Sequence, residues 1–385
     1  MSTVSSRFCI LYPNLGPYHI SRLRALSKHL DCFTAIEISS SEEKYPWGVS
    51  RRDTGFKFCT LFDKPFERIS HAEQKRAVRG ALDELQPEGV MVTGYYEAGM
   101  RAAATWARKH SVPCVMTTDS TQLDKPRSWP KEFLKGLWSR HHYDALFLPG
   151  VRSKTYFTGL KFPEECIWLY TSVVDNDFFE ERSRNVKRGK GDDGSRLAVP
   201  HKYFFTVARL SPEKNIRGLL AAFSSYRKQG GRWHLVIAGS GPQEQELKKL
   251  TVDQSITEVH FIGWKSYDEL PAYYALASCF ILPSISEPWG LVVNEAMACG
   301  LPVLVSRMCG CQPDLCFRGV NGYDFDPYNT DELADLMLQF SGGEMDLDVM
   351  GRQSRKIIAN YTPETWALSL KDCFLTLLAN FADMG

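Results

Sequence analysis

The chain alternates short apolar runs with longer stretches in which apolar residues recur every three or four positions. Such runs predict buried strands, and the recurrence predicts amphipathic helices. In the first half we expect strands at 8–12, 89–93, 112–116 and 145–148, and helices at 20–30, 72–85 and 99–110. Because strands that alternate with helices need crossover connections, the pattern indicates a parallel sheet.

Residues 182–200 interrupt this alternation. They are polar and glycine-rich, so we interpret them as a linker between two domains. The alternation then restarts, with strands expected at 203–207, 233–238, 259–262, 279–282 and 302–305, and helices at 216–227, 243–250 and 291–299. The sequence therefore predicts an α/β protein with two doubly wound, Rossmann-like domains that face each other across a cleft, where ligands would sit outside the carboxyl ends of the strands.

The composition is that of a soluble globular protein. Its 385 residues favour two domains, and a formal net charge of +1 gives no general attraction to nucleic acid. Eleven scattered cysteines without a preceding secretory signal indicate free thiols in a reducing cytoplasm. No apolar run has the length of a membrane-spanning helix, so any membrane contact would be at the surface.

The segment SEPWGLVVNEAMACGLPVLVS, residues 286–306, carries the strongest chemical signal. Gly290 allows close approach of the backbone and opens a helix that Gly300 ends. The free N–H groups at the helix start suit a phosphate. Glu287 lies just before this helix and Glu295 near its second turn, where carboxylates can accept hydrogen bonds from vicinal hydroxyls. From these residues alone, a helix-dipole role for Glu295 and a surface position for Glu287 stay equally open.

The Glu-x7-Glu spacing in EPWGLVVNEAMACGLPV resembles the donor-site signature of retaining glycosyltransferases of family 4, which have the GT-B fold. Other segments resemble the same family in the same order: FFTVARLSPEKNIRGLLAAF, LVIAGSGPQEQELKKL, VHFIGWKSYDELPAYYALASCFILPS and the later VNGYDFDP. Each segment is weak alone. Their order makes the resemblance specific.

The resemblance implies roles for residues of the second half. Arg209 and Lys214 would neutralise the diphosphate of a nucleotide-sugar, because an enzyme that works without a metal needs cations at the leaving group. Glu295 would hold the ribose hydroxyls, and Glu287 the hydroxyls of the donor sugar. The remaining expected donor contacts are the main chain at Ile262 and Gly263 beside the base, Gly290, Leu291 and Val292 at sugar and phosphate, and Gly239 with Gly241, which either shape the pocket or form an ordinary turn.

The first half is less specific. YPNLGPYHISRL resembles the family's first glycine loop, in which Gly16 would admit the donor phosphate. His19 is either an acceptor contact or a helix-start residue.

Many family members carry a histidine before the aspartate in the segment that matches VPCVMTTDSTQLDKPR, but this chain has Thr118 there. Asp119 is therefore the catalytic candidate, or a helix or turn cap. Tyr95, Tyr96 and Glu97 follow a strand end and are weak candidates for the acceptor site, although aromatic packing would also explain the tyrosines.

The resemblance implies an acceptor-binding domain at 1–181, the linker 182–200, a donor-binding domain at 201–363 and a last helix, 364–385, that packs back on the first domain. The expected activity is metal-independent retaining transfer of a sugar from a UDP- or GDP-linked donor to a hydroxyl of a glycan, glycolipid or small molecule, without a cofactor. The catalytic candidates are Glu287, Arg209, Lys214 and Asp119. Two alternatives stay open: a GT-B epimerase or phosphorylase, and a non-catalytic nucleotide-sugar-binding protein.

Two further segments are ambiguous. Residues 125–142 are basic and aromatic, with Trp129, Phe133, Leu137 and Trp138 at helical spacing. They would form either a peripheral contact with the inner membrane surface or a helix that faces the core. Cysteines 309, 311 and 316 lack the paired spacing of structural zinc sites, so no metal is expected.

Overall fold

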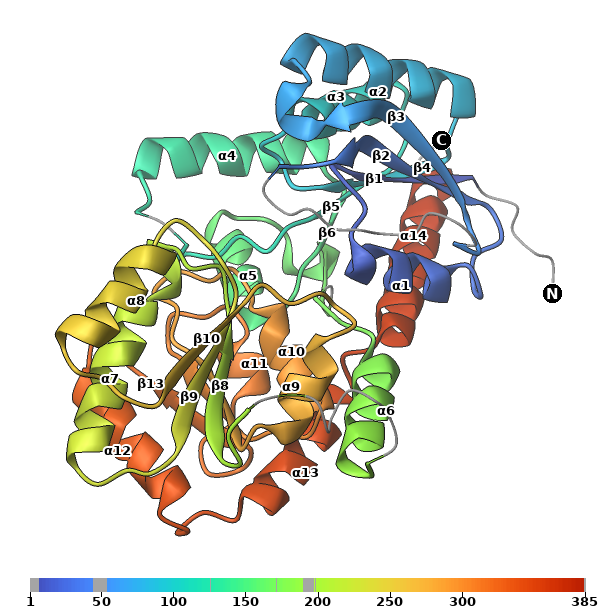
Figure 1. The fold of residues 1–385 in the computed structure, drawn as a ribbon. Coiled ribbons are helices and arrows are strands. Elements are labelled where there is room, and N and C mark those ends of the chain that lie inside the picture. The colour runs from blue at the N-terminus through green and yellow to red at the C-terminus, as the bar shows by residue number, and fades with distance from the viewer. Residues whose placement is uncertain are drawn as a thin grey trace. The chain divides into compact units, whose positions relative to one another are not determined.

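The computed structural model describes residues 7–43, 54–124, 126–170, 172–189, 197 and 199–383 (Figure 1). The chain forms two compact α/β units. The first runs to Gln122, continues from Pro126 to Val174 and resumes at Tyr361, and the second is Asp175–Asn360 together with Leu123 and Asp124.

The first unit is built on a parallel sheet in the order β3-β2-β1-β4-β5-β6-β7. Its strands are β1 (Phe8–Tyr12), β2 (Phe33–Ser41), β3 (Lys57–Pro65), β4 (Gly89–Thr93), β5 (Cys114–Thr117), β6 (Ala145–Phe147) and β7 (Ile167–Trp168). Its helices are α1 (Pro17–Leu26), α2 (His71–Leu85), α3 (Ala98–Lys109), α4 (Trp129–His142), α5 (Val151–Gly159) and α14 (Pro363–Asp383). Helices α2, α3 and α4 pack in one row, while α14 lies beside α1.

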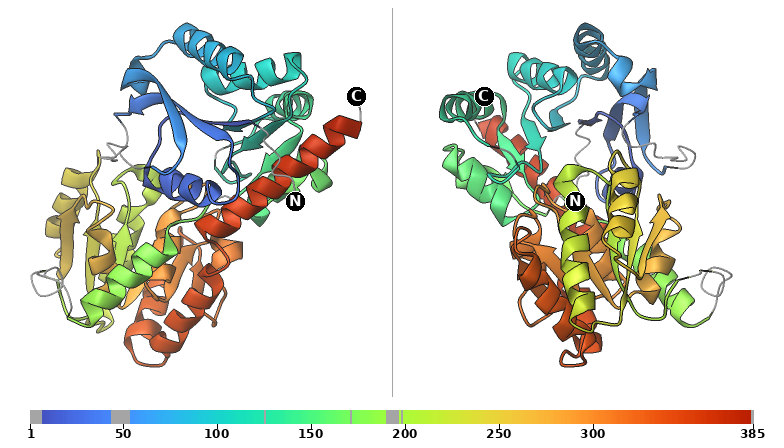
Figure 2. Two further views of the ribbon diagram at one scale, coloured as in Figure 1. Left: turned by 90° about the vertical axis from the view of Figure 1, so that its right-hand side faces the viewer. Right: turned by 60° about the vertical axis from the view of Figure 1, so that its left-hand side comes forward.

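The second unit has a parallel sheet in the order β10-β9-β8-β11-β12-β13 (Figure 2). Its strands are β8 (Tyr203–Val207), β9 (His234–Ala238), β10 (Val259–Gly263), β11 (Cys279–Leu282), β12 (Val303–Ser306) and β13 (Gly322–Phe325). Its helices are α6 (Asn176–Lys187), α7 (Ile216–Lys228), α8 (Glu244–Asp253), α9 (Leu270–Leu276), α10 (Leu291–Ala298), α11 (Gln312–Leu315), α12 (Thr330–Ser341) and α13 (Leu347–Ile358). Helices α7, α8 and α12 pack together, and so do α6, α9, α10 and α13.

These sheets confirm the predicted fold class, two doubly wound Rossmann-like units. In each sheet the strand order reverses at one point, between β1 and β4 in the first and between β8 and β11 in the second. Loops leave the carboxyl ends of such neighbouring strands in opposite directions, which creates the usual ligand position in open α/β sheets.

The observed boundary between the units differs from the expected one. Helix α6 packs on α9 and α10 and belongs to the second unit, so the change of unit comes at Asp175 and not after residue 181. The expected linker 182–200 begins as the last turns of α6, and most of its remainder lies outside the described residues. At the other end of the chain, α14 lies in the first unit, where Phe374 stacks on Phe8 with ring centroids 4.2 Å apart.

Among the described residues, no helix combines the length and apolarity that crossing a bilayer requires.

Close backbone packing at β13 depends on a glycine. Gly322 lies opposite Val303 of β12, and a Cβ atom at Gly322 would come within 1.8 Å of the Val303 carbonyl oxygen. A side chain therefore cannot be accommodated there unless the two strands separate.

We expect Gly322→Ala to lower the free energy of unfolding of the second unit by about 3 kcal/mol, because the added methyl group overpacks against backbone. Urea denaturation followed by circular dichroism measures this change. The control is Gly80→Ala, at an exposed position of α2 where a Cβ atom meets nothing within 4 Å. It should stabilise its helix by about 1 kcal/mol. Equal midpoints for the two variants would contradict the packing argument.

Candidate functional site

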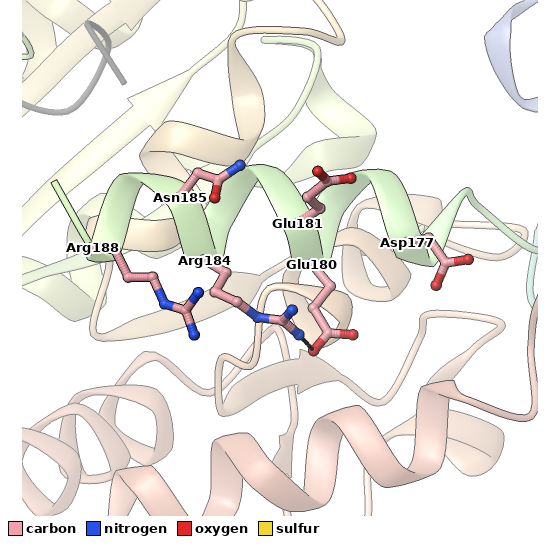
Figure 3. Close-up of a pocket in the computed structure, with 6 residues that line it drawn as sticks. All are labelled: Asp177, Glu180, Glu181, Arg184, Asn185 and Arg188. Atoms are coloured by element: carbon pink, nitrogen blue, oxygen red, sulfur yellow. Dashed lines mark hydrogen bonds and ion pairs between the residues drawn. The ribbon is translucent and has the colours of Figure 1, made fainter. Parts of the chain in front are cut away.

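A charged hollow on the surface of α6 is separate from every predicted site residue. It is lined by Asp177, Glu180, Glu181, Arg184, Asn185 and Arg188 (Figure 3). Arg184 and Glu180, one turn apart, form an ion pair of 2.5 Å. Because all of these side chains come from one solvent-facing helix, we read the hollow as a solvated helix face.

The predicted donor residues gather at the switch point of the second sheet. Arg209 and Lys214 follow β8, and Glu287 follows β11, its neighbour in the sheet. Helix α10 begins at Leu291, immediately after this second loop. The fold thus brings together two loops that lie far apart in the sequence.

Main-chain hydrogen bonds join these two loops. The Glu213 carbonyl accepts from the N–H groups of Ile285 and Ser286, at 2.9 and 3.3 Å. Asn215, in the left-handed conformation with φ 52°, caps α7 by accepting from the Gly218 N–H. Its amide nitrogen donates to the carbonyls that follow β11 and β13, those of Pro283 and Pro327. Asn215 was not among the residues expected at the site, although its position before the helix IRGLLAAF is a capping signal.

Lys214 and Glu287 form an ion pair within this site. The Lys214 Nζ lies 2.5 Å from the Glu287 Oε2, and the two side chains are only 18% and 13% exposed. Ser284 Oγ lies 3.5 Å from the same carboxylate oxygen. Arg209 is exposed, so its charge is accessible from solvent.

The pKa of Glu213 registers the positive charge of this loop. Burial raises this pKa. The hydrogen bond from Ser211 and the nearby charges of Lys214 and Arg209 lower it by more than burial raises it, so the net shift is downward. The charges of Lys214 and Arg209 therefore both reach the Glu213 carboxylate, so the two predicted cations lie close to each other.

The start of α10 has the backbone geometry that the sequence predicted. Gly290 adopts φ 108°, and a Cβ atom there would lie 2.8 Å from the Leu282 side chain. The first N–H groups of a helix, here those of Leu291 and Val292, have no acceptor within the helix. The buried Trp289 Nε1 donates to Asn294 Oδ1 at 3.0 Å and fixes the entry of the chain into α10.

Glu295 has surroundings unlike those of Glu287. Its side chain is fully buried, and its Oε2 accepts a hydrogen bond of 2.7 Å from the Tyr274 hydroxyl of α9. Burial and the nearby Glu295 both raise the pKa of Tyr267, which keeps that phenol protonated. Tyr274 was not anticipated, because the apolar spacing of PAYYAL predicts only core packing for its tyrosines.

The glycines after β9 allow two loops to pack closely. Gly239 has φ 137°, and a Cβ atom there would approach the Ala208 carbonyl oxygen to 1.8 Å. For Gly241 the nearest atom would be the Leu210 carbonyl oxygen, at 2.5 Å. Gly239 also donates its N–H to the carbonyl of Gly263, which ends β10 together with the half-buried Ile262. Both glycines are therefore required by the turn itself.

In the first unit, Gly16 and His19 form the start of α1. Gly16 is the N-cap residue, and its N–H donates to His19 Nδ1 at 3.0 Å. Desolvation, with a smaller contribution from the Arg22 charge, lowers the pKa of His19 to about 3. The helix-start interpretation of His19 thus describes what the ring does in this structure, and the ring is neutral at physiological pH.

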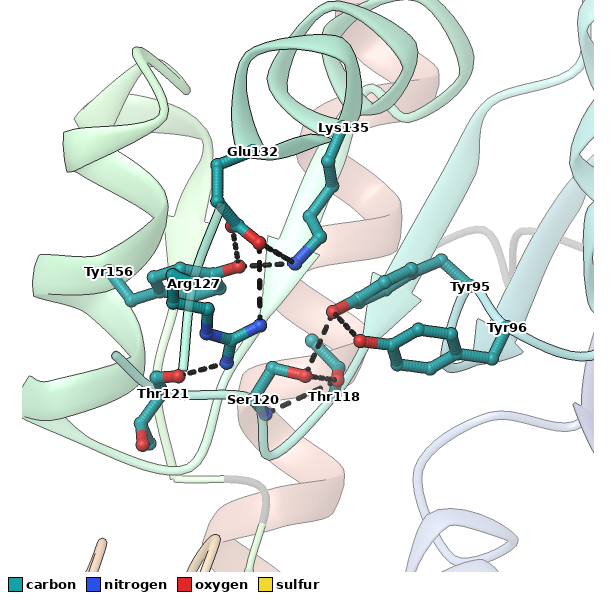
Figure 4. Close-up of polar contacts among 9 residues, drawn as sticks. All are labelled: Tyr95, Tyr96, Thr118, Ser120, Thr121, Arg127, Glu132, Lys135 and Tyr156. Carbon is teal, nitrogen blue, oxygen red and sulfur yellow. Dashed lines mark hydrogen bonds and ion pairs between the residues drawn. The ribbon is translucent and has the colours of Figure 1, made fainter. Parts of the chain in front are cut away.

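The acceptor candidates lie after β4 and β5. The hydroxyl of Tyr95 contacts those of Tyr96 and Ser120, at 3.0 and 3.1 Å, and the two tyrosine rings are tilted by 36° with centroids 4.3 Å apart (Figure 4). Tyr96 is exposed and Glu97 half-buried. The exposed Asp119 accepts from Ser172 Oγ at 3.1 Å.

A charged cluster that the sequence did not indicate lies beside these tyrosines. Glu132 of α4 contacts Arg127, Lys135 and the Tyr156 hydroxyl, and the Lys135 ammonium stands 4.9 Å from the Tyr95 ring centroid (Figure 4). Lys135 and Glu132 are 12% and 16% exposed. The charged face of α4 therefore points into the protein.

The cysteines that follow β12 are buried thiols. Burial raises the pKa of Cys316 to about 12 and holds that of Cys311 well above the usual value of a thiol. Over the part of the chain that the structure describes, these cysteines do not form a group of three able to hold a metal.

Comparison with known proteins gives a family match for the second unit. Residues 192–357 match the family described as glycosyl transferases group 1. The chain is 32% identical over 149 residues to the amylovoran biosynthesis glycosyltransferase AmsK of Erwinia amylovora, covering 37% of this chain and 36% of that protein. It is 31% identical over 175 residues to the GDP-mannose-dependent alpha-(1-6)-phosphatidylinositol monomannoside mannosyltransferase of Mycobacterium tuberculosis, covering 43% and 45%. It is 38% identical over 167 residues to the alpha-monoglucosyldiacylglycerol synthase of Streptococcus pneumoniae, covering 43% and 37%. The matches thus span less than half the length of each of these three relatives.

Solved structures share the fold over nearly the whole chain. Sucrose-phosphate synthase from Thermosynechococcus elongatus superposes with a TM-score of 0.76 at 17% identity, covering 97% of this chain and all of that one. The Anabaena protein HepE in complex with UDP superposes with a TM-score of 0.75 at 15% identity, covering 96% of this chain and all of that one. These neighbours are GT-B glycosyltransferases. Residues 192–357 are thus similar to glycosyl transferases group 1, and two of the three relatives are named as a glycosyltransferase and a mannosyltransferase.

Proposed function

We propose that this chain is a retaining glycosyltransferase of family 4 that transfers a sugar from a nucleotide-diphosphate-sugar to a hydroxyl acceptor. The observation that carries the proposal is the convergence of Arg209, Lys214, Glu287 and the start of α10 at the switch point between β8 and β11. Two cations, a helix N-terminus and a carboxylate at one sheet edge suit a ligand that joins a diphosphate to a polyhydroxyl group. The second unit would bind the donor, and the first the acceptor.

The ion pair between Lys214 and Glu287 indicates what each side chain would bind once the donor is present. When a diphosphate binds, the Lys214 ammonium exchanges Glu287 for a phosphate oxygen, and Arg209 adds a second positive charge. The Glu287 carboxylate then accepts hydrogen bonds from the hydroxyls of the sugar. The main-chain N–H groups of Leu291 and Val292 complete the phosphate site, with Gly290 providing the close approach.

The chemical step follows from this arrangement of charge. The bond between the anomeric carbon and the phosphate oxygen breaks as the acceptor oxygen attacks from the same face, and the leaving phosphate takes the acceptor proton. Arg209 and Lys214 stabilise the charge that develops on the leaving group, so we propose that neither a metal nor a protein nucleophile is required. Asp119 in the first unit is the polar candidate near the acceptor.

The comparisons support both donor bases that the sequence left open. One neighbour of this fold was solved with UDP, and another form of it with UDP-glucose. One relative is named as GDP-mannose-dependent. We therefore propose a UDP- or GDP-linked sugar as donor.

The exposed side chains of helix α4 support the proposal that the acceptor lies at a membrane surface. Its exposed face carries Trp129, Phe133, Leu134 and Leu137, which are 77%, 52%, 63% and 45% exposed. Of the four residues that the sequence placed on one apolar face, only Trp138 packs on the core. This arrangement favours peripheral membrane contact over the core-helix interpretation of residues 125–142. Two relatives are named for lipid substrates or products, a phosphatidylinositol monomannoside and a monoglucosyldiacylglycerol. We propose a glycolipid or lipid-linked acceptor.

We expect Lys214→Met to reduce kcat/KM by about 10²- to 10³-fold, because it removes a charge that stabilises the leaving group. A thermal-shift screen of UDP, GDP and their sugar conjugates first identifies the donor, since a ligand of the native state raises the melting temperature. Turnover is then measured with that donor. Lys228→Met, at the exposed end of α7, is the matched control. Undiminished turnover in a folded Lys214→Met protein would remove Lys214 from the site.

We expect Glu295→Gln to weaken nucleotide binding by about 10- to 100-fold, the loss typical of a hydrogen bond to a charged group. Affinity for inorganic pyrophosphate should be unchanged, because Glu295 would contact ribose and not phosphate. Calorimetric titration with the nucleotide and with pyrophosphate separates the two effects. Glu344→Gln, at an exposed position, serves as the control. Equal losses for both ligands would indicate that Glu295 only supports α10.

We expect the wild-type chain to sediment with vesicles that contain anionic phospholipid. Replacing Trp129 and Phe133 with serine should weaken this partitioning by about tenfold or more, because two large apolar side chains no longer enter the lipid. Val252→Ser, at a 76% exposed apolar position of α8, is the control. Unchanged sedimentation of the double variant would exclude α4 as the membrane contact.

A further inference from the structure

Three potential metal ligands meet at one edge of the second sheet. His234 is the first residue of β9, Glu258 immediately precedes β10, and His260 lies within β10. The His234 Nδ1 is 2.8 Å from the Glu258 Oε2 and 3.0 Å from the His260 Nε2. One ligand atom from each residue lies within 4.8 Å of the other two, and all three residues are half-buried.

The strand register places these side chains on the same face of the sheet. In the parallel pair of β9 and β10, His260 lies opposite Val236, which is two residues after His234. Side chains two residues apart on a strand share a face, so His234 and His260 do. The 2.8 Å distance to His234 places the carboxylate of Glu258, which precedes β10, beside them. The sequence signal was the spacing Glu-x-His in EVHF, which the sequence analysis did not consider.

Glu258 adopts an unusual backbone conformation. Its φ is 64°, in the left-handed region that residues with a side chain seldom occupy. Its carbonyl still accepts a hydrogen bond of 2.9 Å from the Leu235 N–H, so the ladder between the two strands is kept. The strained residue is therefore the one that supplies the carboxylate, as often happens at ligand sites.

The number of protons available at His234 favours a metal over a hydrogen-bonded trio. A neutral His234 ring carries at most one proton on Nδ1 and so can donate it to only one of its two close neighbours. With zinc–ligand bonds of about 2.0–2.1 Å, tetrahedral ligands lie about 3.3 Å from one another. The two short distances at His234, 2.8 and 3.0 Å, are a few tenths of an ångström below that value, so the ligands would move slightly apart when the metal binds. Two imidazoles and one carboxylate form a recognised zinc ligand set that leaves the fourth position for water.

We propose that His234, Glu258 and His260 bind a zinc ion that fastens the edge strand β10 to β9. The ligands lie at the amino ends of these strands, whereas the proposed donor residues follow the carboxyl ends. His260 lies three residues before Gly263, the last residue of β10, which is roughly 10 Å along the strand at about 3.3 Å per residue. The zinc takes no part in the proposed sugar transfer and acts on the stability of the second unit.

The test uses zinc chloride and the 385-residue chain without a histidine tag, previously stripped with a chelator. We expect calorimetry to show saturable binding of one zinc ion per chain, with a rise in melting temperature because the metal binds only the folded strands. The double substitution His234→Gln with His260→Gln should abolish both effects. His71→Gln, at an exposed histidine of α2, should leave them unchanged.

Cobalt identifies the ligands, since the chain also carries many thiols. Cobalt bound by two histidines and a glutamate gives visible bands without the thiolate charge-transfer band that cysteine ligation produces. The circular dichroism and melting temperature of the metal-free double variant establish that it is folded. Failure of the wild-type chain to bind zinc, equal binding by the folded double variant, or a thiolate band would each overturn the proposal.

Discussion

The candidate donor site depends on one main-chain contact, in which the Glu213 carbonyl accepts hydrogen bonds from the two residues that precede Glu287. This contact fixes the loop after β8 to the loop after β11. Lys214 is the next residue along the chain, so its ammonium is held beside the Glu287 carboxylate. Without this contact, the position of the Lys214 loop relative to the Glu287 loop would be less well fixed. Asn215 repeats the constraint from the other side through its amide group.

Strands with a nearly continuous apolar run were predictable from the sequence, whereas repeated polar residues concealed a buried strand. All five strands expected in the second half exist, because in each of them apolar residues fill a sheet that helices cover on both faces. Strand β2 escaped prediction because Glu37 and Ser39 interrupt its apolar run, although both are buried. The Glu37 carboxylate is satisfied by Thr60 of β3 and the Leu15 N–H, partners that only the folded chain supplies. Strand β13 lies in VNGYDFDP, a segment with a family resemblance in which no strand was expected.

The same distinction applies to the site. The helix start at Gly290 could be recognised because a glycine followed by an apolar helix has a local explanation. The pairing of Lys214 with Glu287 and the burial of Glu295 under Tyr274 could not, since each joins segments that are distant in sequence. For α4, the spacing of the apolar residues shows that they share one face of the helix, but not whether this face lies against the core or in solvent. Here Glu132 and Lys135 point inward because Tyr156 and Arg127 provide partners for them.

The buried cysteines can be used to measure how often the core of each unit opens to solvent. Burial raises the pKa of Cys9, Cys299 and Cys316 to about 12, so that almost no thiolate of these three exists in the folded state. Alkylating reagents attack thiolates and must also reach the sulfur atom. The rate at which each of these cysteines is modified therefore reports how often its part of the core is exposed to solvent. Cys9 lies in the first unit and Cys316 in the second, so the native chain already carries a separate reporter for each.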